Sequence, residues 1–254
     1  MSLIRNLPYT HPYRWDGREF GGPQLWRPSN LGANLSLWLD AEDSASITLN
    51  GSTVSQWNDK SGNGRHVSQA AAASQPTYRA TGMLGKPTLD WGASPNNIAL
   101  IRTEMAGYSP VRYFGVADYD GPNPFLDYYG LISHFELGSL DLIITNNEGQ
   151  NWYDERLYFL NGGASSPVAL PTISAPFVFA TNFAQSANRV DIFIGKDRNV
   201  PGRGWIGKIS EIISVDILPS TTDHQRLEGY LAWKWALEAN LPAGHPFKNT
   251  PPTI

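Results

Sequence analysis

Residues 204–252 read GWIGKISEIISVDILPSTTDHQRLEGYLAWKWALEANLPAGHPFKNTPP, and this stretch decides the fold. It predicts one long strand, one helix and a proline-rich tail. Apolar side chains occupy one parity of the strand, as one buried face requires: Trp205, Ile209, Ile213, Val215 and Ile217. Glu211 shares that parity, so its carboxylate is expected to point inward, where it needs a partner or a raised pKa. We expect a structural pair with a lysine, an arginine or a helix end; a β-bulge that swaps the faces and a catalytic role are the alternatives.

A helix is predicted in the sequence that follows Ser220. Thr222 and Gln225 have the spacing of a capping box, and Asp223 lies in the first turn. One apolar stripe follows at i, i+4 and i+8: Leu227, Leu231 and Trp235. The Leu241-Pro242 step is expected to end the helix. A helix with one apolar stripe is expected to cover a sheet rather than to bind a partner.

The rest of the chain has the pattern of an all-β protein. Leu35, Leu37 and Leu39 alternate with other residues, and a further alternating run covers residues 190–194. The chain has 24 glycines and 19 prolines, which supply turns, and 12% aromatic residues, which suit strands. Only 17% of the residues are charged, which argues against a coiled coil or a disordered chain.

Two blocks of sequence resemble a known family. The first contains LSLWLDAEDSASI (35–47), VSQWNDKSGNGRHVSQ (54–69), QPTY (75–78) and GKPTLDWG (85–92). The second contains GKISEIISVD (207–216), YLAWKW (230–235) and LPAGHPF (241–247). Together they resemble the concanavalin A-like lectin/glucanase (laminin-G-like jelly-roll) module, which occurs in phage virion proteins and in secreted carbohydrate-binding proteins. The resemblance implies a concanavalin-like β-sandwich (jelly roll) with one C-terminal capping helix, but such modules share no single activity.

Residues 1–31 are expected to form an extended N-terminal arm, and residues 32–254 the sandwich domain. Four prolines, at positions 8, 12, 23 and 28, interrupt regular structure in this segment. Between them lie the aromatic and basic residues that we assign to an assembly or anchoring role: Tyr9, Tyr13, Trp15, Phe20, Trp26, Arg14 and Arg18. The alternative is that these rings pack on the chain's own domain.

Charge and composition exclude several classes of protein. The net charge is −4, so no basic nucleic-acid-binding surface is expected. No cysteine is present, which excludes disulfides and thiolate metal sites. The first residues contain no apolar signal-peptide core, and no run of about 18 apolar residues predicts a membrane span. We expect a protein made in the host cytoplasm that leaves the cell on the exterior of a virion.

Two aromatic, loop-rich segments, 118–130 and 146–155, are the predicted glycan-binding surface. Aromatic faces stack on the apolar side of sugar rings, and neighbouring polar groups hydrogen-bond to hydroxyls. The predicted binding residues combine both kinds: Tyr119, Asp120, Asn123, Phe125, Asp127, Tyr128, Trp152 and Tyr153. Packing of these loops on the sandwich is the alternative.

Neither a cofactor nor catalysis is predicted. Asp59, in the turn-dense WNDKSGNG segment, is the one candidate calcium ligand, and an Asx-type turn is the favoured alternative. The five histidines show no paired spacing for a metal. A retaining glycosidase needs two carboxylates about 5 Å apart, and the E-x-D-x-x-E pattern of jelly-roll glucanases is absent.

The predicted function is therefore structural. We expect a phage capsid decoration protein or a small tail or baseplate component, with an outward lectin-like domain that binds glycans. The expected partners are other virion proteins, through the arm, two further copies in a homotrimer, and cell-surface polysaccharide. A non-catalytic carbohydrate-binding module of a secreted or surface protein is the first alternative, and a glycoside hydrolase the second.

Overall fold

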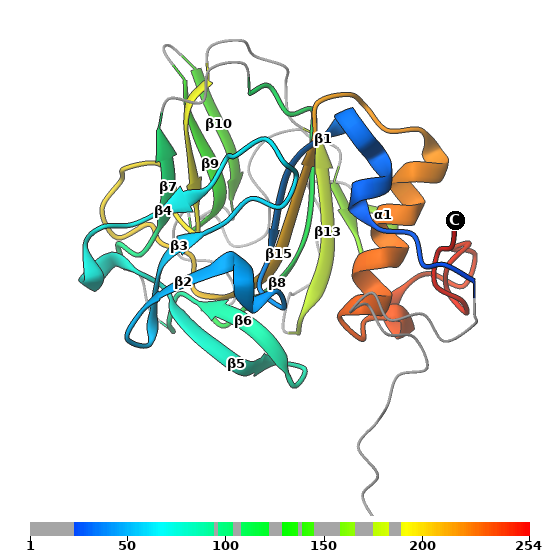
Figure 1. Ribbon diagram of the computed structural model, residues 1–254, viewed down its shortest axis with the longest axis horizontal. Helices are drawn as coiled ribbons and strands as arrows, with labels where there is room; N and C mark the ends of the chain where they lie inside the picture. The colour runs from blue at the N-terminus through cyan, green and yellow to red at the C-terminus, as the bar shows by residue number, and fades with distance from the viewer. Residues whose placement is uncertain are drawn as a thin grey trace, which may run out of the picture.

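The structure is a computed structural model that describes residues 23–93, 96–103, 108–121, 129–136, 139–144, 158–165, 175–182 and 189–254. Its strands pair almost entirely antiparallel along one continuous path (Figure 1). In order along that path they are β10 (Ser139–Ile144), β9 (Gly130–Glu136), β14 (Arg189–Ile194), β7 (Leu100–Thr103), β4 (Val67–Ser68), β3 (Thr53–Trp57), β5 (Thr77–Met83), β6 (Lys86–Asp90), β15 (Gly207–Val215), β8 (Arg112–Tyr119), β13 (Phe177–Asn182), β11 (Tyr158–Leu160) and β12 (Gly163–Ser165). In addition, β1 (Leu35–Asp40) pairs with β15, and β2 (Ile47–Asn50) pairs with β3.

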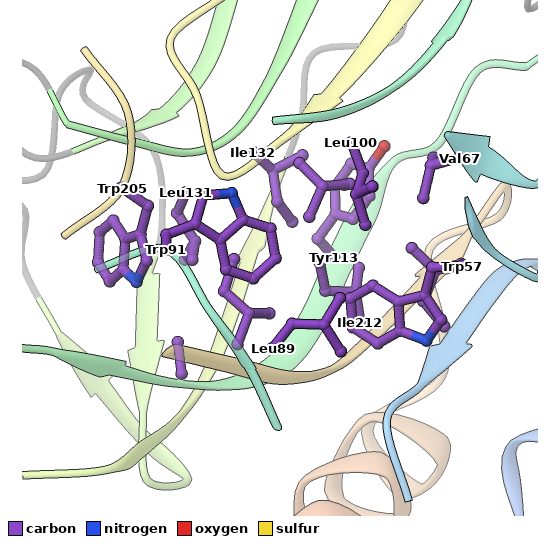
Figure 2. Packing of buried hydrophobic residues seen from close by; sticks show 14 of the residues in the cluster. Trp57, Val67, Leu89, Trp91, Leu100, Tyr113, Leu131, Ile132, Trp205 and Ile212 are labelled. Atoms are coloured by element: carbon purple, nitrogen blue, oxygen red, sulfur yellow. The ribbon is translucent and has the colours of Figure 1, made fainter. Parts of the chain in front are cut away.

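The path bends so that its two halves pack face to face. Figure 2 shows Trp57, Leu100 and Ile132 from one half in the same cluster as Tyr113 and Ile212 from the other. These side chains are essentially inaccessible to solvent. The inner core is therefore the space between two β layers, which confirms the predicted all-β sandwich.

A second apolar core lies on the outer face of β1, β8, β13 and β15, where α1 (Thr221–Lys234) packs (Figure 1). The predicted stripe is confirmed, because Leu227, Leu231 and Trp235 are all fully buried there. The fold thus has three layers, two of strands and one of helix. Alternation on β8 shows the division: Phe114 and Val116 face the helix, whereas Tyr113 faces the inner core.

The helix begins after Ser220 as predicted, but its capping residue and its C-terminal end differ from the prediction. The N-cap is Ser220, whose Oγ accepts the backbone N–H of Asp223 at 3.1 Å, and not Thr222. The helix ends at Lys234 because Ala236 adopts a left-handed conformation (φ 57°). A separate 3-10 turn (Glu238–Asn240) precedes the Leu241-Pro242 step.

The long strand does not keep one parity. The register of β15 shifts between Ile209 and Glu211, so one extra residue is inserted there. Ile209 points into the inner core, whereas Glu211 and Ile213 face the helix. The β-bulge that the sequence left as an alternative is therefore confirmed, and the prediction of a single apolar face is wrong beyond Ile209.

Residues 23–34 are integrated into the helix side of the sandwich. Trp26 is 4% exposed and belongs to the outer core, and its N–H donates to the carbonyl of Pro252 at 2.9 Å. Leu25 pairs with Thr253, and a 3-10 segment (Pro28–Asn34) leads into β1. For Trp26 the alternative holds: the ring packs on the chain's own domain. The other proposed arm residues lie outside the described residues: Tyr9, Tyr13, Trp15, Phe20, Arg14 and Arg18.

Candidate functional site at the 195–207 hairpin

The connection between β14 and β15, residues 195–207, forms a hairpin that touches both halves of the sandwich. Its Arg203 carbonyl accepts the Gly130 N–H of β9 at 3.2 Å, and its Ile206 carbonyl accepts the Asp120 N–H that follows β8 at 3.0 Å. Gly130 permits this approach, since a Cβ there would lie 2.0 Å from the backbone nitrogen of Asp197. The hairpin therefore gathers polar side chains from distant parts of the sequence.

A buried carboxylate organises the cations of the hairpin. Asp197 is fully buried, and its Oδ1 accepts Arg198 Nε at 2.5 Å. Its Oδ2 accepts Arg198 Nη2 and Arg203 Nη1, each at 3.0 Å. Such charge-assisted, partly bidentate bonds fix both guanidinium groups in place.

A second charged group lies where β8 ends. Asp118 and Asp120 are two residues apart and share Lys208, whose Nζ lies 3.4 Å from Asp118 Oδ2 and also contacts Asp120. Burial and the charge of Asp120 raise the pKa of Asp118. Burial lowers the pKa of Lys208, but its hydrogen bond and ion pair with Asp120 outweigh this, so its pKa is raised. The group offers one ammonium and two carboxylates to a polar ligand.

The predicted aromatic surface is wrong at Tyr119. Its ring is 4% exposed and packs in the inner core against Trp205, with ring centroids 5.2 Å apart. The reason is strand parity: Tyr119 shares the inward face of Tyr113, whereas Asp118 and Asp120 share the outward one. Asp120 is exposed, as a binding residue requires. The remaining predicted residues lie outside the described residues: Asn123, Phe125, Asp127, Tyr128, Trp152 and Tyr153.

Sequence reasoning missed most of this site. The missed residues are Asp118, Lys208, Lys196, Asp197, Arg198 and Arg203. Two signals were present in the sequence. Asp118 and Asp120 have the i, i+2 spacing that places two carboxylates on one face of a strand, and GKDRNVPGRG concentrates cations in a glycine-rich turn.

Asp59 is occupied by the protein's own hydrogen bonds. Its Oδ1 accepts the backbone N–H of Trp38 at 3.0 Å and of Ser61 at 2.9 Å. Its Oδ2 accepts the N–H of Arg65 at 2.9 Å and the hydroxyl of Ser61 at 2.8 Å. The same turn satisfies the open edge of β1, since Asn63 Nδ2 donates to the Leu35 carbonyl at 3.0 Å. This is the Asx-type turn that the sequence favoured over a calcium site.

Asp59→Ala is expected to lower the free energy of unfolding by about 2–4 kcal/mol, because it leaves several partly or fully buried N–H donors without an acceptor. Urea denaturation with and without calcium tests this. A loss below about 0.5 kcal/mol, or a wild-type protein that calcium stabilises through Asp59, would contradict the structural role.

Glu211 makes the structural pair that was expected of it. It is fully buried, and its Oε1 accepts Trp38 Nε1 at 2.7 Å and the Tyr230 hydroxyl at 2.9 Å. Its Oε2 accepts Trp235 Nε1 at 2.6 Å and lies 2.8 Å from Lys234 Nζ. Burial raises the pKa of Glu211, although the Lys234 charge opposes the rise. The carboxylate is therefore enclosed by donors and joins the helix to the sheet.

Lys234 is shared between two buried carboxylates. Its Nζ lies 2.6 Å from Asp40 Oδ1 as well as 2.8 Å from Glu211. Burial would lower the pKa of Lys234, but the charges of Asp40 and Glu211 raise it above its usual range. Burial would likewise raise the pKa of Asp40, but Lys234 and Lys60 together lower it.

Two histidines converge on Glu228 between α1 and the C-terminal tail. His224 Nε2 lies 3.0 Å from Glu228 Oε1, and His245 Nε2 lies 3.3 Å from Oε2. Arg112 Nη1 lies 2.7 Å from His224 Nδ1, and since a guanidinium only donates, that nitrogen accepts. Burial would raise the pKa of Glu228, but the two imidazoles lower it. This arrangement ties the tail to the helix and leaves no open coordination position at His224 Nδ1.

In the part of the chain that the structure describes, no group of three or more His, Asp or Glu side chains is arranged to hold a metal ion. None of the described helices is long and apolar enough to cross a membrane. Comparison of the chain with protein-family models, with curated proteins and with solved structures finds no match.

Proposed function

We propose that this chain is an exterior structural component of a bacteriophage particle, either a capsid decoration protein or a small tail or baseplate protein. Its sandwich would be a concanavalin-like jelly roll, with α1 as its cap. The likeness of residues 35–252 to modules found in virion proteins supports this proposal. Because one fold hosts many functions, the site and the assembly segment must carry the rest of the argument.

The observation that carries the assembly role is the pairing of residues 24–26 with the C-terminal residues. Residues 24–26 pair with residues 252–254 beside α1, through the Trp26–Pro252 and Ile254–Gln24 hydrogen bonds, each 2.9 Å. Residues 1–22 are thus joined to the helix side of the body. We assign to these residues the anchoring to other virion proteins, with a homotrimer as the assembled form.

The sandwich is proposed to bind cell-surface polysaccharide without catalysis. Support comes from the hairpin site, where Lys208, Asp118 and Asp120 place hydrogen-bonding groups together at an exposed strand end. The same observation favours the second candidate, a non-catalytic carbohydrate-binding module with no assembly role. Oligomeric state separates the two candidates.

Light scattering on the full-length chain and on a variant that begins at Pro23 tests the assembly role. The boundary follows the structure, because removal of residues 1–31 would also take Trp26 from the core. We expect a full-length trimer and a folded monomer from the shortened chain. Folded monomers in both cases would contradict homotrimer assembly through the arm, and glycan binding by that monomer would favour the second candidate.

A further inference from the structure

The hairpin carries a local excess of positive charge in an acidic chain. Residues 195–204, GKDRNVPGRG, contain Lys196, Arg198 and Arg203 against a single carboxylate, Asp197, whereas the whole chain has a net charge of −4. The hydrogen bonds to Gly130 and Asp120 hold the hairpin on the sandwich. The excess is therefore fixed in place rather than spread over a solvated loop.

The single carboxylate is already used by the two arginines. Arg198 binds both of its oxygens, and Arg203 binds Oδ2 at 3.0 Å. Asp197 is close enough to favour the charged form of Lys196, but it accepts no hydrogen bond from that ammonium. The residues of the hairpin itself therefore carry a net charge of +2.

Lys196 is the residue that points to a ligand. The residue is only 6% exposed, and its ammonium has neither a hydrogen bond nor an ion pair among the described residues. The ammonium nitrogen itself is accessible to solvent. Burial lowers its pKa, with the Asp197 charge opposing. A lysine whose stem is buried and whose accessible ammonium has no partner among the described residues can bind an anion from solvent. Lys234, by contrast, has two carboxylate partners.

We propose that Lys196 binds an anionic group of a saccharide, a carboxylate, sulfate or phosphate, with the charges of Arg198 and Arg203 adding to the attraction. The inference rests on the proposed glycan-binding function and specifies its ligand as acidic polysaccharide. The anion supplies the counter-charge that Lys196 lacks, and binding should weaken as salt concentration rises.

The test is the affinity of the full-length protein for four probes, measured by isothermal titration calorimetry. The probes are oligogalacturonate for a carboxylate, a sulfated dextran oligosaccharide for a sulfate, a glycerol-phosphate oligomer for a phosphate, and neutral dextran. Neutral dextran shows whether an uncharged saccharide binds. We expect at least one anionic probe to bind, and Lys196→Met to weaken it at least tenfold. Lys86→Met is the matched control, because Lys86 pairs with Glu42 at 2.9 Å and lies outside the hairpin; its affinity should match the wild type.

Thermal unfolding of the same variants guards against misfolding. Lys196→Met is expected to keep the wild-type Tm, since it removes an accessible charge that has no partner among the described residues. If Lys196→Met binds the anionic probe as tightly as the wild type, the proposal is overturned. It is also overturned if only neutral dextran binds, although glycan binding itself would then stand. If inorganic phosphate binds in a Lys196-dependent way and no saccharide does, the anion site stands and the glycan function fails.

Discussion

Lys234→Met is expected to lower the free energy of unfolding by about 3–5 kcal/mol at pH 7, the cost of leaving buried charge without its partner. The substitution keeps the length of the side chain but removes the one ammonium that lies between Asp40 and Glu211. Asp40 retains Lys60 at 2.8 Å, whereas Glu211 keeps only the Trp38, Tyr230 and Trp235 donors. Glu211 therefore bears most of the loss.

The pH dependence of this variant follows from the directions of the pKa shifts. Glu211 has a raised pKa in the folded state, so its contribution to stability is present below its unfolded value of 4.5 and is lost as pH rises through the folded value. Without Lys234 that pKa rises further, so the deficit of the variant is expected to shrink on acidification from pH 7 towards pH 5. At the alkaline end, the pKa of Lys234 is raised in the folded state, so its ion pairs stabilise the wild type fully below about pH 10.5. This contribution is lost as the pH rises further, and the variant lacks it at every pH.

Urea denaturation between pH 5 and pH 11 measures both effects. The double variant Glu211→Gln with Lys234→Met is expected to recover part of the loss, because the amide oxygen still accepts hydrogen bonds and no charge is left unpaired. Lys86→Met is the control for removal of a lysine near the same helix, with an expected effect within about 1 kcal/mol. A deficit that is independent of pH would show that packing, not charge, explains the loss.

Gly130→Ala is expected to displace the 195–207 hairpin at a cost of about 3 kcal/mol, the upper end of the range for a group forced into a packed site. A Cβ at this position would lie 2.0 Å from Asp197 N and 2.1 Å from Lys196 C, and both are backbone atoms that cannot rotate away. The hydrogen bond from Gly130 N to Arg203 O would be lost with them. Binding to an anionic saccharide should fall as well, although Gly130 itself touches no ligand.

Amide hydrogen exchange locates this effect. The amides of Asp197 and Trp205, which bond to Arg203 and Gly195, are expected to lose protection while those of β13 keep it. Gly244→Ala is the matched control, because no atom lies within 4 Å of its added Cβ, and its stability should stay near that of the wild type. Unchanged protection in the Gly130→Ala hairpin would contradict the docking of the hairpin on β9.

Local periodicity in the sequence determined the all-β class and the apolar stripe of α1. These features depend on neighbours two to four residues away, so the chain specifies them before it folds. Strand parity also predicts the buried position of Tyr119, since Tyr113 and Tyr119 lie on the same face of the strand. The loop-like composition around Tyr119 favoured an exposed side chain instead.

Only the tertiary structure decided how the polar groups are used. The bulge in β15 sets which residues face the helix beyond Ile209, and it depends on pairing with β8. The donors to Glu211 come from as far as Trp38, 173 residues away, and the donors to Asp59 include the same residue. Likewise, the exposure and pairing of Lys196 depend on how the hairpin docks on β9. Hydrogen bonds and charge pairs act over a few ångströms in space, so a sequence shows which groups need partners and the fold decides which partners they receive.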